Sequence, residues 1–160
     1  MDTSTLLPGD LVLVRGKSFI DRAIEDISHS TYSHVALVKQ GTTLLEAQGG
    51  RRIGPQSLFF YKGNADIYRI KGLDEFQRNA IIAKAKTYVG ERYDYSLIVW
   101  EFIRYTFGVY LPFVEEGKLI CSTFVTDSIR GAGLEFCEGI KFPSPGDVAK
   151  DPSLEFIGTY

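Results

Sequence analysis

Cysteine, histidine and tryptophan are scarce in this 160-residue chain, which contains two, two and one of them. Two cysteines, Cys121 and Cys137, are too few for a disulfide framework, although a single bridge between them stays open. Together with His29 and His34, they are spaced too widely along the sequence to match a zinc site. We therefore expect neither a metal ion nor an organic cofactor.

Excess charge of one sign and long apolar runs are also lacking. The net charge is −2, and lysine and arginine are scattered rather than gathered into the basic stripe of a nucleic-acid-binding protein. No apolar run approaches the ~20 residues of a transmembrane helix, and the segment from Met1 to Pro8 lacks the basic start and apolar run of a signal peptide. We expect a cytoplasmic protein, unless a signal has been removed, with no nucleic-acid partner and no integral membrane segment. The composition predicts no particular oligomeric state.

What is present is the composition of an ordinary globular domain, with 44% hydrophobic and 24% charged residues. We expect a single domain over residues 1–160 because a chain of this length can bury one full-sized core. Alternation and helical periodicity predict strands at 11–14, 32–38, 44–48, 66–70 and 154–157, and helices at 19–27, 73–89, 96–107 and 122–130. The segment from Gly49 to Pro55 predicts a loop, because glycine and proline interrupt regular structure.

The predicted hairpin from Tyr32 to Gln48 carries two polar residues, His34 and Glu46, that a structural role explains poorly. If its loop holds the three residues 40–42, His34 lies opposite Gln48, and Glu46 is its diagonal neighbour on the same face. Such neighbours lie roughly 7–8 Å apart at the backbone, within reach of a His–Glu hydrogen bond. A two-residue loop would put the two side chains on opposite faces of the sheet. The register of the hairpin therefore decides whether the pair can form.

Cys121 is the candidate nucleophile because it stands at the start of the helix predicted at 122–130. The unpaired N–H groups and the dipole of a helix start stabilise a thiolate, and the same groups can hold an oxyanion. A histidine within reach would activate the thiol and protonate the leaving group, and a carboxylate behind it would fix the histidine tautomer. Cys121, His34 and Glu46 supply these three roles.

Structural explanations stand beside these roles, because a single cysteine in an apolar segment is commonly an inert core residue. Cys137 follows the predicted helix and has no helix start to activate it, and His29 lies in a predicted loop, so neither is a catalytic candidate. A phosphatase loop would need an arginine six residues after Cys121, where Asp127 stands.

Four segments stand out along the chain: Pro8-Gly9-Asp10-Leu11, Ser33-His34-Val35-Ala36-Leu37, Leu45-Glu46-Ala47 and Ile120-Cys121-Ser122-Thr123-Phe124. Together they resemble the NlpC/P60 superfamily of papain-like cysteine hydrolases. Their order resembles the circularly permuted, YiiX/YaeF-like branch, in which the cysteine helix comes late, and Tyr93-Asp94-Tyr95 before a helix is similar to that branch too. The resemblance runs from about Pro8 to Gly133. It implies an α+β fold, with a small antiparallel sheet packed with helices in the permuted papain-like arrangement.

The resemblance also implies the roles of individual residues. Cys121 would be the nucleophile, His34 the general base and acid, and Glu46 the residue that orients the histidine, where many ordinary members have a second histidine. Ile120 and Thr123 depart from the residues usual around the Cys-Ser pair, which leaves the substrate class open. The candidates to bind substrate are Tyr32, Tyr95 and Gln48.

We therefore expect a cysteine hydrolase that cleaves an amide bond, in a cell-wall-type peptide or a related amide, through a thioester acyl-enzyme. The first alternative is acyl transfer or lipid amide and ester hydrolysis by the same residues, which an aromatic helix at 96–107 facing the cleft would favour. The second alternative is a non-catalytic binding module on the same fold. Separation of His34 from Glu46, or burial of Cys121 away from His34, would favour that module.

Overall fold

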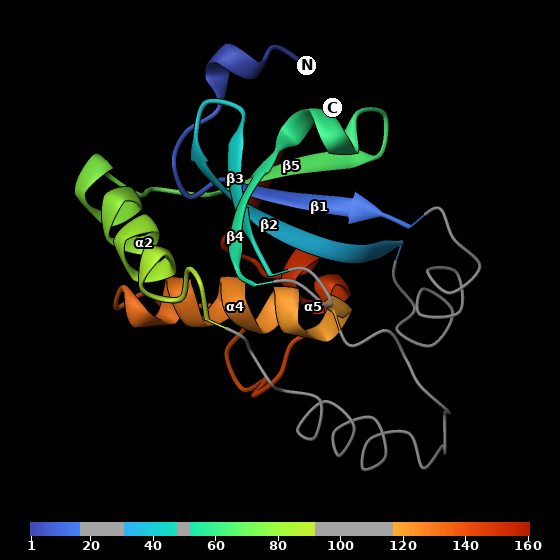
Figure 1. Ribbon diagram of the computed structural model, residues 1–160. Helices are drawn as coiled ribbons and strands as arrows, with labels where there is room; N and C mark the ends of the chain where they lie inside the picture. Colours follow the sequence, from blue (N-terminus) through green and yellow to red (C-terminus); the bar gives the residue numbers. More distant parts are fainter. Residues whose placement is uncertain (17–30, 48–51, 92–116) are drawn as a thin grey trace, which may run out of the picture.

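The computed structural model describes residues 1–16, 31–47, 52–91 and 117–160 (Figure 1). Its strands are β1 (Leu11–Arg15), β2 (Tyr32–Gln40), β3 (Thr43–Glu46), β4 (Gly54–Ser57), β5 (Ala65–Ile70) and β6 (Leu154–Thr159). Its helices are η1 (Thr3–Thr5), η2 (Leu58–Tyr61), α2 (Glu75–Thr87), α4 (Gly117–Gly131) and α5 (Pro145–Ala149). The helices expected at 19–27 and 96–107 lie outside the described residues.

The strands form one antiparallel sheet of six, in the order β4-β3-β2-β1-β5-β6. Helix α4 packs against β2 and is flanked by α2 and α5, so that the α-helices cover one side of the sheet (Figure 1). The expected α+β class, a small antiparallel sheet packed with helices, is confirmed. No helix within the described ranges has the length and apolar character needed to cross a membrane.

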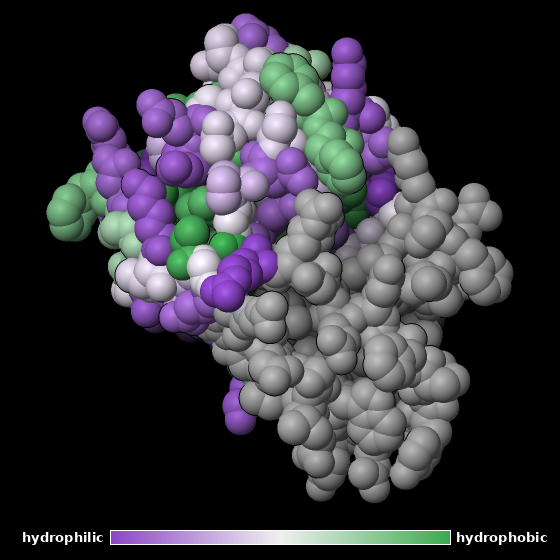
Figure 2. Space-filling view, viewed as in Figure 1, coloured by the Kyte–Doolittle hydropathy of each residue, from purple (hydrophilic) through white to green (hydrophobic). Residues whose placement is uncertain are grey.

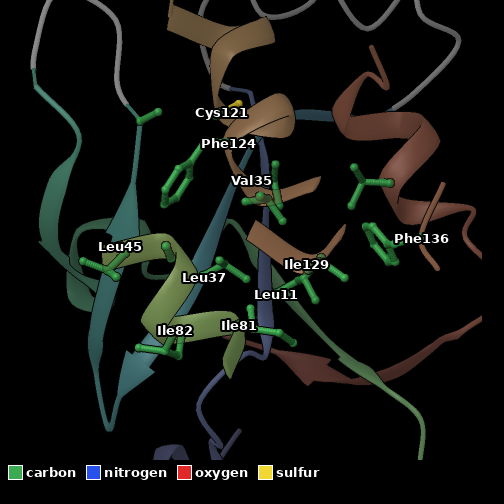
Figure 3. Close-up of a cluster of buried hydrophobic side chains, with 14 of the residues drawn as sticks. Leu11, Val35, Leu37, Leu45, Ile81, Ile82, Cys121, Phe124, Ile129 and Phe136 are labelled. Atoms are coloured by element: carbon green, nitrogen blue, oxygen red, sulfur yellow. The ribbon is translucent and has the colours of Figure 1, made fainter. Parts of the chain in front are cut away.

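Alternation along the strands divides the apolar side chains between two cores. Leu11 and Leu37 belong to the larger core, where they meet Ile81 of α2 and Phe124 of α4 (Figure 3). The smaller core lies on the opposite face of the sheet and includes Val12, Ala36, Leu44, Leu58 and Tyr61. Among the described residues, this second face is covered in part by the short η2 segment.

The hairpin between β2 and β3 has the register that brings His34 and Glu46 to one face. Its turn is the two residues Gly41 and Thr42, with Gln40 paired to Thr43. A regular hairpin with this turn would have separated the two side chains. The register shifts, however, between Val38 and Gln40, where one extra residue is taken up, and the ladder continues as Leu37 opposite Leu45. This bulge restores the register that a three-residue loop was expected to give.

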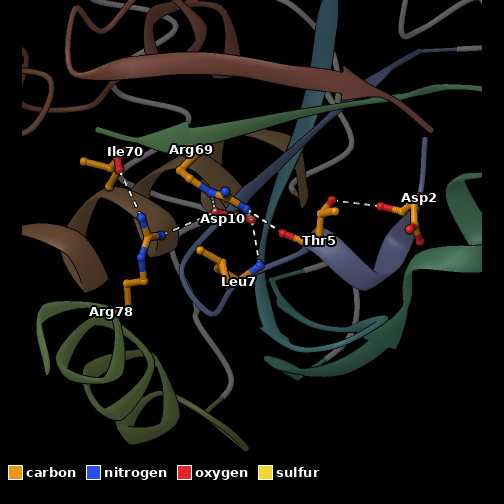
Figure 4. A network of polar contacts seen from close by, with 7 residues as sticks. All are labelled: Asp2, Thr5, Leu7, Asp10, Arg69, Ile70 and Arg78. Atoms are coloured by element: carbon orange, nitrogen blue, oxygen red, sulfur yellow. Dashed lines mark hydrogen bonds and ion pairs between the residues drawn. The ribbon is translucent and has the colours of Figure 1, made fainter. Parts of the chain in front are cut away.

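The start of β1 is fixed by the buried carboxylate of Asp10, which is 0% exposed (Figure 4). Gly9 adopts a left-handed φ of 83°, and this turn brings Asp10 to the sheet. The carboxylate accepts a hydrogen bond from the backbone N–H of Leu7 at 2.8 Å and is paired with the guanidinium groups of Arg69 and Arg78. The Pro-Gly-Asp segment is therefore a structural joint between β1, β5 and α2.

Local sequence patterns predict helix α2 correctly but fail to predict strand β4. The helix expected at 73–89 forms as α2, where the side chain of Asp74 accepts a hydrogen bond from the backbone of Gln77 and Gly90 follows the helix with a φ of 88°. The prediction of a loop from Gly49 to Pro55, by contrast, is wrong at its C-terminal end. Residues from Gly54 onward form β4, which pairs with β3 as the edge strand of the sheet.

Candidate active site

His34 and Glu46 meet on one face of the sheet. The His34 Nε2 atom lies 3.0 Å from Glu46 Oε2, and both side chains are buried, with 11% and 4% of their surfaces exposed. His34 is paired with Val14, next to a shift of register in the β1–β2 ladder between Val14 and Arg15. Such irregularities bend a strand and redirect its side chains, and they are common beside active sites.

The Glu46 carboxylate has two more donors. The Tyr61 hydroxyl lies 2.6 Å from Glu46 Oε2, the same oxygen that contacts His34, and the Tyr61 and His34 rings are 5.7 Å apart. The Gln56 side chain of β4 also hydrogen-bonds to Glu46. Three side chains from three segments thus converge on one buried carboxyl group.

These donors keep Glu46 ionised in spite of its burial. Burial by itself raises the pKa of Glu46, but the hydrogen bond and charge of His34, followed by the hydrogen bonds of Tyr61 and Gln56, lower it overall. Burial, followed by the hydrogen bond and charge of Glu46, raises the pKa of Tyr61, so its hydroxyl stays protonated and donates. Glu46 is therefore a carboxylate that accepts a hydrogen bond from His34 Nε2, which leaves Nδ1 as the second functional nitrogen of the ring.

Cys121 is the second side chain that interacts with His34. Its side chain is 0% exposed and forms part of the core beneath α4 (Figure 3). Burial by itself lowers the pKa of His34, but the charge and hydrogen bond of Cys121, followed by the hydrogen bond and charge of Glu46, raise it above its ordinary value. The arrangement therefore favours an imidazolium ion at His34, between the Cys121 side chain and the Glu46 carboxylate.

The position of Cys121 within its helix corrects one expectation. Helix α4 begins at Gly117, so Cys121 lies in the second turn and not at the helix start. Only the N–H groups of the first turn of a helix lack partners within it, and Cys121 lies after that turn. The N–H of Cys121 itself is thus not one of the free donors expected to hold an oxyanion. The helix dipole also contributes little at Cys121, because its effect fades beyond the first turn.

The expected substrate-binding residues fall into two groups. Gln48 and Tyr95 lie outside the described residues. The Tyr32 hydroxyl donates to Asp66 Oδ2 at 2.8 Å and lies 3.1 Å from the Tyr68 hydroxyl. Tyr32 is thus held in a polar cluster on β5, and its role in binding substrate stays a prediction.

Cys137 is not part of this arrangement. Neither cysteine forms a disulfide, so the bridge between them that the sequence left open is not present. Cys137 is buried with a left-handed φ of 48°, and its N–H donates to Asp151. Burial, followed by the charge of Asp151, raises the pKa of the Cys137 thiol to about 12. Its chemistry is that of an inert thiol, as the sequence suggested.

Tyr61 and Gln56 are the site residues that sequence reasoning missed. Both follow the glycine-rich segment that was expected to be a loop, and no local pattern marks either as a partner of Glu46. The only signal near them is an unusual aromatic run, Phe59-Phe60-Tyr61, in which the first two side chains are 61% and 67% exposed. Figure 2 shows an apolar ridge over this part of the surface.

A metal centre finds no support among the described residues. Within residues 1–16, 31–47, 52–91 and 117–160, no group of three or more histidine, cysteine, aspartate and glutamate side chains has an arrangement that could hold a metal ion. The buried side chains of Cys121, His34 and Glu46 instead interact with one another, in an arrangement suited to acid–base and nucleophilic chemistry.

No protein-family model matches the chain, and no curated protein sequence matches it. Among solved structures, it is similar to the metalloprotein YiiX from Escherichia coli O157:H7, with a TM-score of 0.57. The similarity covers 96% of this chain and 97% of that chain, at 22% sequence identity. The chain therefore shares the fold of YiiX over nearly its whole length.

Proposed function

We propose that this chain is a cysteine hydrolase of the permuted NlpC/P60 type that cleaves an amide bond through a thioester intermediate. The observation that carries the proposal is the buried series Cys121–His34–Glu46, in which the histidine contacts both partners. A cell-wall-type peptide or a related amide is the proposed substrate class. The shared fold with YiiX supports the family assignment, and the acid–base arrangement supports the chemistry.

The reaction follows from the charges in the site. The Cys121 thiolate attacks the carbonyl carbon, and the His34 imidazolium then gives its Nδ1 proton to the departing amine as the carbon–nitrogen bond breaks. This step leaves a thioester and a neutral imidazole. Water next gives a proton to Nδ1 and attacks the thioester, and the carbon–sulfur bond breaks to restore the thiolate and the imidazolium. Glu46 stays ionised throughout and holds the Nε2 proton in its hydrogen bond.

No step of this proposal passes through a metal ion. The structural neighbour is described as a metalloprotein. In the described part of this chain, however, the histidine, cysteine and carboxylate side chains do not gather into a set of three or more that fits a metal. The proposed roles rest on the side chains of the triad alone.

Alkylation of the two cysteines tests the proposal directly. Iodoacetamide labelling would be followed by mass spectrometry at each cysteine across a range of pH, for the unaltered protein and for His34→Ala. We expect fast labelling of Cys121 well below pH 8, slow labelling of Cys137, and loss of the fast rate in His34→Ala. Hydrolysis of peptide amides and matched esters, with Cys121→Ser as the inactive control, would then define the substrate.

The burial of Cys121 is the observation that favours a different class of function. A thiol that is 0% exposed has no direct path to solvent, as in a binding module that keeps the fold without turnover. Labelling of Cys121 that is slow and indifferent to His34 would support that module and would reject the hydrolase. Fast labelling with turnover of esters but not of amides would instead favour the acyl-transfer or lipid-hydrolysis alternative.

A further inference from the structure

Tyr61 lies beside the triad and donates a hydrogen bond to the carboxylate of Glu46. Its hydroxyl lies 2.6 Å from Glu46 Oε2, closer than the 3.0 Å between that oxygen and His34 Nε2. The Tyr61 ring is held in the smaller core, 7% exposed, and its edge meets Phe60 at a ring separation of 5.2 Å. The ring is therefore fixed by packing, and the hydroxyl has a defined direction toward the carboxylate.

We infer that Tyr61 is a positioning residue of the triad, whose hydroxyl keeps Glu46 in the charged form that orients His34 and thereby sets the low-pH limit of Cys121 reactivity. This inference rests on the proposed function. It assigns Tyr61 no contact with substrate, because the hydroxyl acts on Glu46 and only through it on the imidazole.

One oxygen of Glu46 is shared by the two donors. A carboxylate oxygen that accepts from both a phenol and an imidazole is fixed in one orientation, so it always faces Nε2. Burial favours the neutral carboxyl group, and each donor opposes burial by stabilising the charge. When Glu46 takes up a proton, the imidazolium loses its carboxylate partner and the thiolate–imidazolium pair is weakened.

The titratable groups that face Glu46 come from several elements. His34 approaches from β2 and Tyr61 from η2, and the charge of Cys121 on α4 acts on both of them. Gln56 of β4 adds a donor that does not titrate. Of the two titratable donors, only Tyr61 can be removed without removing the catalytic base, so it is the one that can be tested separately.

Tyr61→Phe is the test variant because it removes the hydroxyl and keeps the ring. Tyr68→Phe is the matched control, since the Tyr68 hydroxyl lies in a separate polar contact with Tyr32. The rate of Cys121 alkylation would be measured from pH 4 to pH 9 in each protein. We expect Tyr61→Phe to react about as fast as the unaltered protein at pH 8 and to lose its reactivity at a higher pH on the acid side, because without the Tyr61 hydroxyl the Glu46 carboxyl takes up its proton more readily. Tyr68→Phe should follow the unaltered profile.

Each outcome separates this inference from the proposed function. Suppose that labelling of Cys121 depends on His34, but the pH profiles of Tyr61→Phe and the unaltered protein coincide. That result would overturn the role of Tyr61 and leave the proposed function standing. Labelling that is indifferent to His34 would reject the proposed function itself. In the Glu46→Gln background, Tyr61→Phe should cause no further change, because its effect passes through the carboxylate. A further change of similar size would overturn the inference.

A measurement on the unaltered ring covers the case in which Tyr61→Phe does not fold. Tyrosine labelled with carbon-13 at Cζ reports the hydrogen bond of each hydroxyl by nuclear magnetic resonance. The Tyr61 signal should move in Glu46→Gln, because its acceptor loses its charge, whereas the Tyr68 signal should stay in place. A Tyr61 signal that does not respond to Glu46→Gln would overturn the inference.

Discussion

Asp10 and Arg69 form a two-point ion pair across 59 positions of sequence, with Nε donating to Oδ1 over 2.8 Å and Nη2 to Oδ2 over 2.7 Å. The carboxylate is 0% exposed, and Arg78 approaches its Oδ1 atom from α2 at 3.4 Å. This geometry, rather than any part in catalysis, accounts for the aspartate of the Pro-Gly-Asp segment.

Asp10→Asn is predicted to destabilise the fold strongly. The change leaves two guanidinium groups without their buried counter-charge, and breaking a buried pair in this way costs about 3–5 kcal/mol. Urea unfolding should show a lower midpoint with little change in slope. Glu138→Gln, a change at an exposed carboxylate, is the control. Equal midpoints for the two variants would contradict the prediction.

Glu46→Gln is predicted to reduce turnover by roughly a hundredfold or more, by analogy with loss of the orienting carboxylate in other triads. An amide carries no charge to stabilise the imidazolium and can present its NH₂ group to Nε2. The variant should retain substrate binding, so the loss should fall on kcat. A loss confined to KM would contradict the role of Glu46 as the residue that orients His34.

The dependence of stability on pH should show opposite signs for Glu46 and His34. The pKa of Glu46 is lowered in the folded state, so its contribution is present above the ordinary carboxyl range, near ~4.3, and is lost as the pH falls through the folded value. The pKa of His34 is raised, so its contribution is complete below ~6.5 and is lost as the pH rises through the folded value.

Urea unfolding of the unaltered protein and of Glu46→Gln between pH 7 and pH 3 measures the acid side of this dependence. The difference in unfolding free energy should be about 1–3 kcal/mol at neutral pH and should shrink toward pH 3. A difference that stays constant over this range would show that Glu46 does not titrate with folding.

Cys137 should remain unlabelled while Cys121 reacts. At pH 8 a thiol with a pKa of about 12 is ionised to only about one part in ten thousand, and the thiolate is the reactive form. Unfolding in urea should remove the difference and label both cysteines equally. Comparable labelling of Cys137 in the folded protein would contradict its burial against Asp151.

The regular elements were predictable because their signals are local. Alternation marked β1, β2 and β5, and helical periodicity marked α2. Strand β4 was not predicted because Pro55 argues against a strand. Proline is tolerated there because an edge strand can leave one side of its backbone unpaired.

The site was predictable in its three central residues and not in their surroundings. Cys121, His34 and Glu46 each carry reactive groups, and the register of one hairpin is enough to bring the last two together. Tyr61 meets Glu46 only through the packing of η2 against the sheet, and no sequence pattern encodes that packing. The start of α4 was placed too late because Gly117 has a low helix propensity.

Deletion of Lys39 is predicted to leave the His34–Glu46 pair intact. Lys39 is the residue between Val38 and Gln40 at the shift of register, so its removal converts the hairpin to a regular one with the same later pairs. A two-residue turn that begins with glycine suits such a hairpin. His34-dependent labelling of Cys121 should therefore persist in the deletion variant. Its loss would show that the bulge itself is required.

The bulge in this hairpin also bears on how relatives should be sought. Twelve positions separate His34 from Glu46, but the chain between them contains a place where a residue can be gained or lost without turning either side chain to the other face. A search pattern with a fixed gap between the histidine and the carboxylate would thus miss proteins with the same geometry. A better criterion is that the strand pairing places the histidine and the carboxylate on the same face of the hairpin. The number of residues at the end of the hairpin should be allowed to vary.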